Sequence, residues 1–129
     1  MRGLIITENG EFVETEIINL EDMQKAVKGN FELIIITASG MEIYCNKEGK
    51  FLEKINPIAT GIIETLLGFG LANKIYGNLL FWRNSGISDE DIQEVNNWFN
   101  SYFMNCIKEA KNWEATAPQF SFSIWFILY

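Results

Sequence analysis

The chain has no histidine among its 129 residues. This absence excludes Ser–His and Cys–His nucleophile pairs, zinc sites with histidine ligands, and the commonest general base near neutral pH. The sequence also lacks a GxxxxGK[ST] or GxGxxG phosphate loop and an EF-hand calcium loop. We therefore predict a protein that is not an enzyme, with no catalytic residues, no cofactor and no metal site.

Cysteines and long apolar runs are scarce as well. Cys45 and Cys106 lack CxxC spacing, and a chain of this size needs no disulfide, so we expect both thiols to be reduced and the protein to be cytoplasmic. No segment reaches the ~18 consecutive apolar residues that a membrane-spanning helix needs. Glu8 interrupts the first apolar run too early for a signal peptide. We predict no membrane association.

Basic residues are fewer than acidic ones, 10 against 17, which gives a net charge of −7. Residues 1–22 contain six acids and one base, whereas residues 23–83 contain seven bases and five acids. An acidic chain repels the phosphates of nucleic acids, so direct nucleic-acid binding is not expected. The charge favours association with basic partners instead.

The residues that are present suit one α+β domain. Apolar and alternating segments predict strands at residues 4–6, 12–18, 31–37, 41–45 and 79–82, with hairpin turns at Asn9-Gly10 and Ser39-Gly40. We expect FELIIIT at 31–37 to be the central strand, because nearly continuous apolar residues are typical of a strand covered on both faces. Phe51 and Leu52 are expected to return the chain to the apolar layer.

Three helices are predicted. Asn19 caps the first, at 20–27; Pro57 begins the second, which ends at Gly68; Ser88 caps the third, which continues to about Trp113. We expect the aromatic residues of the third helix to pack in the core, since they recur at helical spacing. The predicted fold is a single mixed, mainly antiparallel sheet of about five to six strands, packed by two short helices and one long amphipathic helix.

The chain ends in a very apolar segment, QFSFSIWFILY, which predicts a further strand. Such a strand must pair, either with the sheet of its own chain or with the same strand of a neighbour. We predict a homodimer through it. The domain organisation is then one domain over 1–129, with the long helix and this strand at 84–129 following residues 1–83.

One polar cluster is a candidate binding site. The turn NKEGK at 46–50, together with a following asparagine and threonine, offers amide, ammonium and hydroxyl groups that could converge on an anionic or polar ligand. The candidate ligand-binding residues are Asn46, Lys47, Lys50, Asn56 and Thr60. The alternative is a solvated hairpin end followed by a helix cap.

A second set of residues is a candidate partner surface. Glu14 and Glu16 point to the same side of their strand, and we interpret these acids as structural rather than catalytic. Trp98 lies off the main apolar stripe of the long helix and is the aromatic residue expected to be exposed there. Trp125, in the C-terminal segment, completes the candidate partner-binding residues.

A family resemblance involves the stretch around the polar turn. Gly29 after a short helix, YCNKEGK at 44–50, NPIAT at 56–60 and IYGN at 75–78 resemble the family of the domain of unknown function numbered 3846. The resemblance covers about residues 1–83, although the family pattern favours an acid where Lys47 stands. It implies the fold and a setting in phages, plasmids and conjugative elements, whose small acidic proteins often disarm host defences. It carries over no catalytic residue.

We therefore predict a non-enzymatic interaction protein of a phage or mobile element, with an anti-defence role, in the host cytoplasm. It would hold a host protein, such as a defence factor, through acidic and apolar surfaces. The alternative is a small-ligand or nucleotide-binding module that uses the NKEGK turn. An enzyme that uses carboxylates and lysines alone is a third hypothesis.

Overall fold

The computed structural model describes residues 1–68 and 74–114. Its strands form one five-stranded sheet in the order β2-β1-β5-β4-β3, and all neighbouring pairs are antiparallel. The strands are β1 (Arg2–Ile6), β2 (Phe12–Glu16), β3 (Phe31–Ile36), β4 (Glu42–Asn46) and β5 (Leu79–Trp82). The helices are α1 (Leu20–Val27), α2 (Gly49–Leu52), α3 (Pro57–Leu67) and α4 (Asp89–Glu114). The α+β prediction is confirmed, with the correction that the sheet holds no parallel pair within these residues.

Both predicted hairpins are present. The turn after β1 places Gly10 at a φ of 84°, a conformation that glycine adopts without steric cost, and β2 then pairs with β1 from Arg2↔Glu16 to Ile6↔Phe12. The turn between β3 and β4 uses Gly40 at a φ of 90°. Each hairpin therefore forms where the sequence has a turn signal.

The central strand is β5, so the prediction that residues 31–37 occupy the centre is wrong. β5 pairs with both β1 and β4, and its Leu79, Leu80 and Phe81 side chains are fully buried. β3 lies at an edge, where Leu33 and Ile36 are exposed. The run of isoleucines in β3 resembles a central strand in composition, but strand order depends on where the chain returns after α3.

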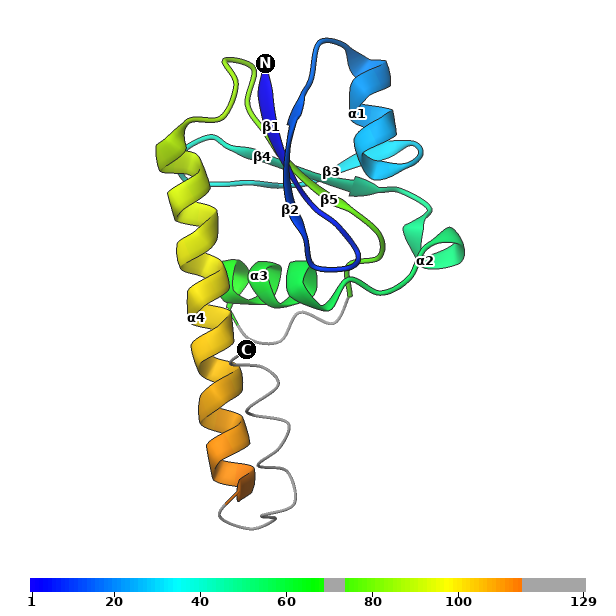
Figure 1. Cartoon of the computed structure of the whole chain (residues 1–129). Coiled ribbons are helices and arrows are strands. Elements are labelled where there is room, and N and C mark those ends of the chain that lie inside the picture. Colours follow the sequence, from blue (N-terminus) through cyan, green and yellow to red (C-terminus); the bar gives the residue numbers. More distant parts are fainter. Residues whose placement is uncertain (69–73, 115–129) are drawn as a thin grey trace.

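Helices cover both faces of the sheet, with α3 and α4 on one side and α1 on the other (Figure 1). On the first side Ile6, Ile43 and Phe81 pack with residues of α3 and α4. On the second side Ile5 and Leu80 alternate with them and pack against α1. Because both faces of β1 and β5 are covered, their apolar residues run without a polar interruption.

The helix starts follow the predicted caps. The Oδ1 atom of Asn19 accepts a hydrogen bond from the Asp22 N–H at 3.0 Å, and Asn56 caps α3 in the same way through the Ala59 N–H at 3.0 Å. The Ser88 Oγ accepts from the Asp91 N–H at 3.1 Å and opens α4. The C-terminal part of α4 extends beyond the sheet (Figure 1).

Helix α2 is an element that the sequence analysis did not predict. The Glu53 N–H donates to the Gly49 carbonyl at 2.7 Å and closes a single helical turn. This turn directs Phe51 and Leu52 outward, with exposed fractions of 76% and 69%. The expectation that they re-enter the apolar layer is wrong, because the turn forms before the chain reaches the sheet again.

Two further predictions concern membrane-spanning helices and the C-terminal strand. No helix within residues 1–68 and 74–114 is long and apolar enough to span a bilayer. The predicted strand at 119–129, its Trp125 and the dimer contact lie outside the residues that the structure describes.

Candidate functional site

A cavity of about 570 Å³ lies where the β3–β4 hairpin faces α2 and the segment 74–76. We call it the lysine cavity. Its lining residues are Glu32, Ile34, Cys45, Asn46, Lys47, Lys50, Ile55, Lys74, Ile75 and Tyr76.

Backbone hydrogen bonds hold the segment 74–76 against the start of α3. The Asn56 N–H donates to the Ile75 carbonyl at 2.8 Å, and the Ile75 N–H donates to the Thr60 Oγ1 at 2.9 Å. Residues 55 and 76 form an isolated antiparallel bridge. The wall of the cavity opposite the hairpin is therefore fixed by main-chain contacts rather than by side chains alone.

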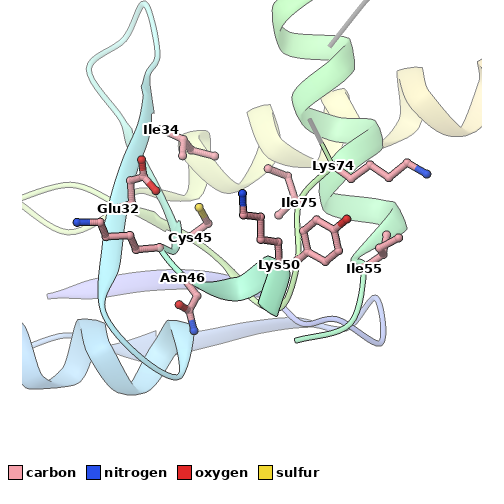
Figure 2. A pocket seen from close by; sticks show the side chains of 10 residues that line it. Glu32, Ile34, Cys45, Asn46, Lys50, Ile55, Lys74 and Ile75 are labelled. Carbon is pink, nitrogen blue, oxygen red and sulfur yellow. The ribbon is translucent and has the colours of Figure 1, made fainter. Parts of the chain in front are cut away.

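The cavity is positively charged although the protein is acidic. Lys47, Lys50 and Lys74 line it, and Glu32 is its only acidic lining residue among those described. Figure 2 shows Lys50 rising between Cys45 and Ile75, with its ammonium group in the middle of the labelled side chains. The Lys50 Nζ also lies 4.9 Å from the centroid of the Phe51 ring, within the range of a cation–π contact. The cavity is suited to an anionic group.

Cys45 is a neutral thiol in the wall of this cavity. Burial, with a smaller contribution from the charge of Glu32, raises the pKa of the thiol from 9.0 to about 11. Because the thiolate is the nucleophilic form, Cys45 is a poor nucleophile at neutral pH. It contributes a weakly polar surface to the cavity and no obvious chemistry.

Asn46 lines the cavity, but its side chain already has partners elsewhere. Its Nδ2 donates to the carbonyls of Val27 and Lys28 at the end of α1, at 3.3 and 3.2 Å. Its Oδ1 accepts from the Glu48 N–H at 2.9 Å. These bonds tie the end of β4 to the end of α1, so the Asn46 amide stabilises the fold.

Asn56 and Thr60 are not brought into the lysine cavity. Asn56 is completely buried, and its Nδ2 donates to the carbonyls of Ile6, Thr7 and Gly77 at 2.8–3.1 Å. The Thr60 Oγ1 donates to the Asn56 carbonyl at 2.9 Å while accepting from Ile75. For these two residues the alternative prediction of a helix cap agrees with the structure, because their polar side-chain atoms form hydrogen bonds within the protein.

Several lining residues were missed by the sequence analysis. Glu32 lies on the neighbouring strand, and Lys74 and Tyr76 come more than twenty positions after the NKEGK turn. The family resemblance included Tyr76 and Cys45, but nothing in their spacing indicated that they share a cavity with Lys50. Only the return of the chain after α3 brings them together.

The predicted partner residues divide into three cases. The Glu14 carboxylate accepts from the Arg2 Nε at 2.6 Å, and Glu16 is paired with the terminal amine of Met1, so both acids are partly neutralised. Trp98 is half-buried and its ring centroid lies 6.4 Å from that of Phe81, so the expectation of an exposed tryptophan is wrong. Trp98 packs toward the core because the buried face of α4 is wider than the apolar stripe that the sequence predicts for this helix. Trp125 is outside the described residues.

No metal centre is evident in the part of the chain that the structure describes. Within residues 1–68 and 74–114 there is no group of three or more cysteine, aspartate or glutamate side chains that could hold a metal ion.

The comparisons with known proteins concern the whole domain rather than this cavity. A comparison with curated proteins gave no match, and a comparison with solved structures gave none. A family model described as "Domain of unknown function (DUF3846)" matches residues 1–100. The match includes β1 to β5, α1 to α3 and the first part of α4, and so continues past residue 83, where the resemblance was expected to end. On this evidence the chain belongs to the DUF3846 family.

Proposed function

We propose that this protein binds a small anionic ligand, of the nucleotide class, in the lysine cavity. The observation that carries the proposal is the lining of one cavity by Lys47, Lys50 and Lys74, with Glu32 as the one acid among the described lining residues, in a protein of net charge −7. The Lys50 ammonium group lies among the labelled lining side chains, whereas Lys74 extends away from them (Figure 2). Its volume falls within the range of about 300–1,000 Å³ that is usual for small-molecule sites. A local excess of positive charge in an otherwise acidic protein concentrates anions at this place.

The lining residues offer complementary contacts to the two parts of a nucleotide. Lysine ammonium groups bind phosphate oxygens as point charges. The Tyr76 ring and the side chain of Ile55 supply an aromatic and apolar wall for a base. A nucleotide would thus place its phosphates near Lys50 and its base toward the segment 74–76.

Thermal-shift measurements with nucleoside mono-, di- and triphosphates test this proposal. A ligand at a hundred times its dissociation constant adds about 2.7 kcal/mol to the free energy of unfolding, which gives a clear rise in Tm. Lys50→Ala is expected to abolish most of the rise. Lys54→Ala is the matched control, because Lys54 is exposed, close in sequence and not a lining residue. A flat screen, or an equal shift in both variants, contradicts the proposal.

We propose binding without turnover, in the cytoplasm. The absence of histidine from the sequence and the neutral Cys45 thiol support this part of the proposal. Mass spectrometry of a nucleotide after long incubation with the protein is expected to recover it unchanged. Conversion that requires Lys50 would show that the protein is an enzyme.

A second proposed function is binding of a basic host protein, in the setting of a phage or mobile element and directed against host defence. The observation that favours it is the stretch 3–24, which contains six acids and no base. Affinity capture from host lysate is expected to yield a basic protein that is released at high salt and lost in a Glu11→Gln/Glu21→Gln variant. Glu90→Gln/Glu109→Gln, which removes the same charge from α4, is the control. Capture that is insensitive to salt contradicts this function.

A further inference from the structure

We infer that a groove on the α1 side of the sheet receives an apolar side chain from a partner segment that carries lysine or arginine beside it. This inference rests on the second proposed function and names its contact surface. The groove lies between the end of β2, the start of α1 and the end of β5, and has a volume of about 290 Å³. Its lining residues are Ile17, Ile18, Asn19, Leu20, Met23 and Trp82.

The groove has a buried floor and an exposed apolar rim. Ile17 and Met23 are buried, whereas Ile18 and Leu20 have exposed fractions of 79% and 67%. Two large apolar side chains left in water beside an apolar recess are typical of a contact surface. The recess has room for a large side chain, which is how a partner anchors in a binding hot spot.

The backbone of the rim is already ordered. The Ile18 N–H donates to the Asp22 Oδ2 at 2.8 Å, and the Asn19 side chain caps α1. The Ile17 N–H donates to the Met1 carbonyl at 2.8 Å. Because these bonds hold the rim in place, a partner would not have to order it on binding.

Trp82 lines the groove with its indole ring. Its Nε1 is buried and has no acceptor among the described residues. A tryptophan N–H usually finds a partner when it is buried.

Charge decides which occupant the groove suits. Glu16, Glu21 and Asp22 adjoin the lining residues in the sequence. The nearby cations are each paired with an acid: the Met1 amine with Glu16, Arg2 with Glu14 and Lys25 with Glu21. Asp22 is not in an ion pair among the described residues, so acids outnumber cations around the groove. Arg83, which follows Trp82, bonds to Asp91 and Ser39 instead. A second copy of this acidic chain would bring like charges together, whereas a segment with basic residues beside an apolar one is complementary.

Selection of a displayed library of random peptides on the full chain tests the inference. The expected consensus is a large apolar residue with lysine or arginine beside it. A synthetic consensus peptide should bind about tenfold more weakly to Ile18→Ser and to Leu20→Ser, as expected when a hot-spot contact is lost. Ile36→Ser is the control, because Ile36 is equally apolar and 61% exposed but lies on β3, away from the groove. Both rim variants are expected to fold, since their side chains are in water.

The outcomes of this experiment show whether the groove is the binding site, separately from whether the protein binds a basic partner at all. Loss of affinity in both rim variants but not in the control supports the groove. Equal binding of a basic peptide to all variants overturns the groove and leaves the acidic surface as the site. An enriched consensus without basic residues, or no enrichment, overturns the inference, while the salt-sensitive capture described above decides separately whether the protein binds a basic partner.

Discussion

At the scale of single residues, Gly61 shows how a contact can outweigh helix propensity. Glycine within a helix costs roughly 1 kcal/mol relative to alanine. In α3, however, a Cβ atom at Gly61 would lie 2.3 Å from the ring of Tyr102 on α4. The glycine is therefore needed for the close packing of the two helices.

Gly61→Ala is accordingly expected to destabilise the protein. The overpacked ring costs about 1–3 kcal/mol or more, which exceeds the gain in helix propensity. The measurement is the free energy of unfolding in urea. In a Tyr102→Ala background the clash is absent, so the same substitution should become neutral or stabilising. Destabilisation of equal size in both backgrounds would show that Tyr102 is not the cause.

The two asparagines predicted to bind a ligand also have roles that depend on the tertiary fold. The sequence indicated Asn46 and Asn56 as candidate ligand-binding residues, whereas in the structure both side chains are buried and hydrogen-bonded within the protein. It did not indicate that their amides bond to main-chain carbonyls of distant segments. The helix cap that Asn56 forms involves a residue three positions away, so it can be predicted from the sequence. The bond from Asn56 to the Ile6 carbonyl spans fifty positions and depends on the tertiary fold.

At the scale of elements, the start of α4 is attached to the sheet by an ion pair. The Asp91 carboxylate accepts from the Arg83 Nη2 at 2.9 Å and Nε at 3.1 Å, and from the Ser88 N–H at 3.0 Å. Arg83 also donates to the Ser39 carbonyl in the β3–β4 turn. One arginine thus joins the end of β5, the helix start and a hairpin turn.

This ion pair predicts a pH dependence of stability. Burial alone would raise the pKa of Asp91, but the hydrogen bonds from Arg83 and Ser88 lower that pKa below its ordinary value of 3.8. A carboxyl group whose pKa is lowered in the folded state stabilises the protein above its unfolded pKa. That contribution is lost as the pH falls through the folded pKa.

Asp91→Asn is therefore expected to lower the free energy of unfolding at pH 7 by about 1–3 kcal/mol. The difference from the unsubstituted protein should shrink in urea titrations at pH values below about 4. Asp89→Asn serves as the control, because Asp89 pairs with Arg2 at the surface with its side chain 92% exposed and should contribute about 0–1 kcal/mol. A difference for Asp91→Asn that stays constant with pH would argue against the ion pair.

At the scale of the whole molecule, the two faces of the sheet carry different candidate surfaces. The lysine cavity lies on the side of α3, where Cys45 packs, and the groove with Trp82 lies on the side of α1. A ligand in one does not obstruct a partner at the other. Variants at Lys50 should therefore leave peptide binding at the groove unchanged.

The predicted homodimer through the C-terminal strand at 119–129 stays a prediction. Light scattering of the full chain is expected to give twice the monomer mass, because an unpaired strand of this apolar character associates readily. Phe122→Lys/Ile124→Lys should shift the mass toward the monomer, since two charges would be buried in the pairing. A monomer mass for the unsubstituted chain would refute the dimer.

The sequence by itself determined the local features of this protein. Caps, turn glycines and apolar periodicity predicted the hairpins and the helices α1, α3 and α4, because these signals act over a few residues. The order of the strands, the outward turn of Phe51 and the half-buried position of Trp98 were decided only by the tertiary structure. The same is true of the lysine cavity, which Lys50 and Lys74 both line because the chain returns past α2 on its way to β5 at the centre of the sheet. Contacts between distant segments depend on how whole elements pack, and no short-range pattern in the sequence specifies that packing.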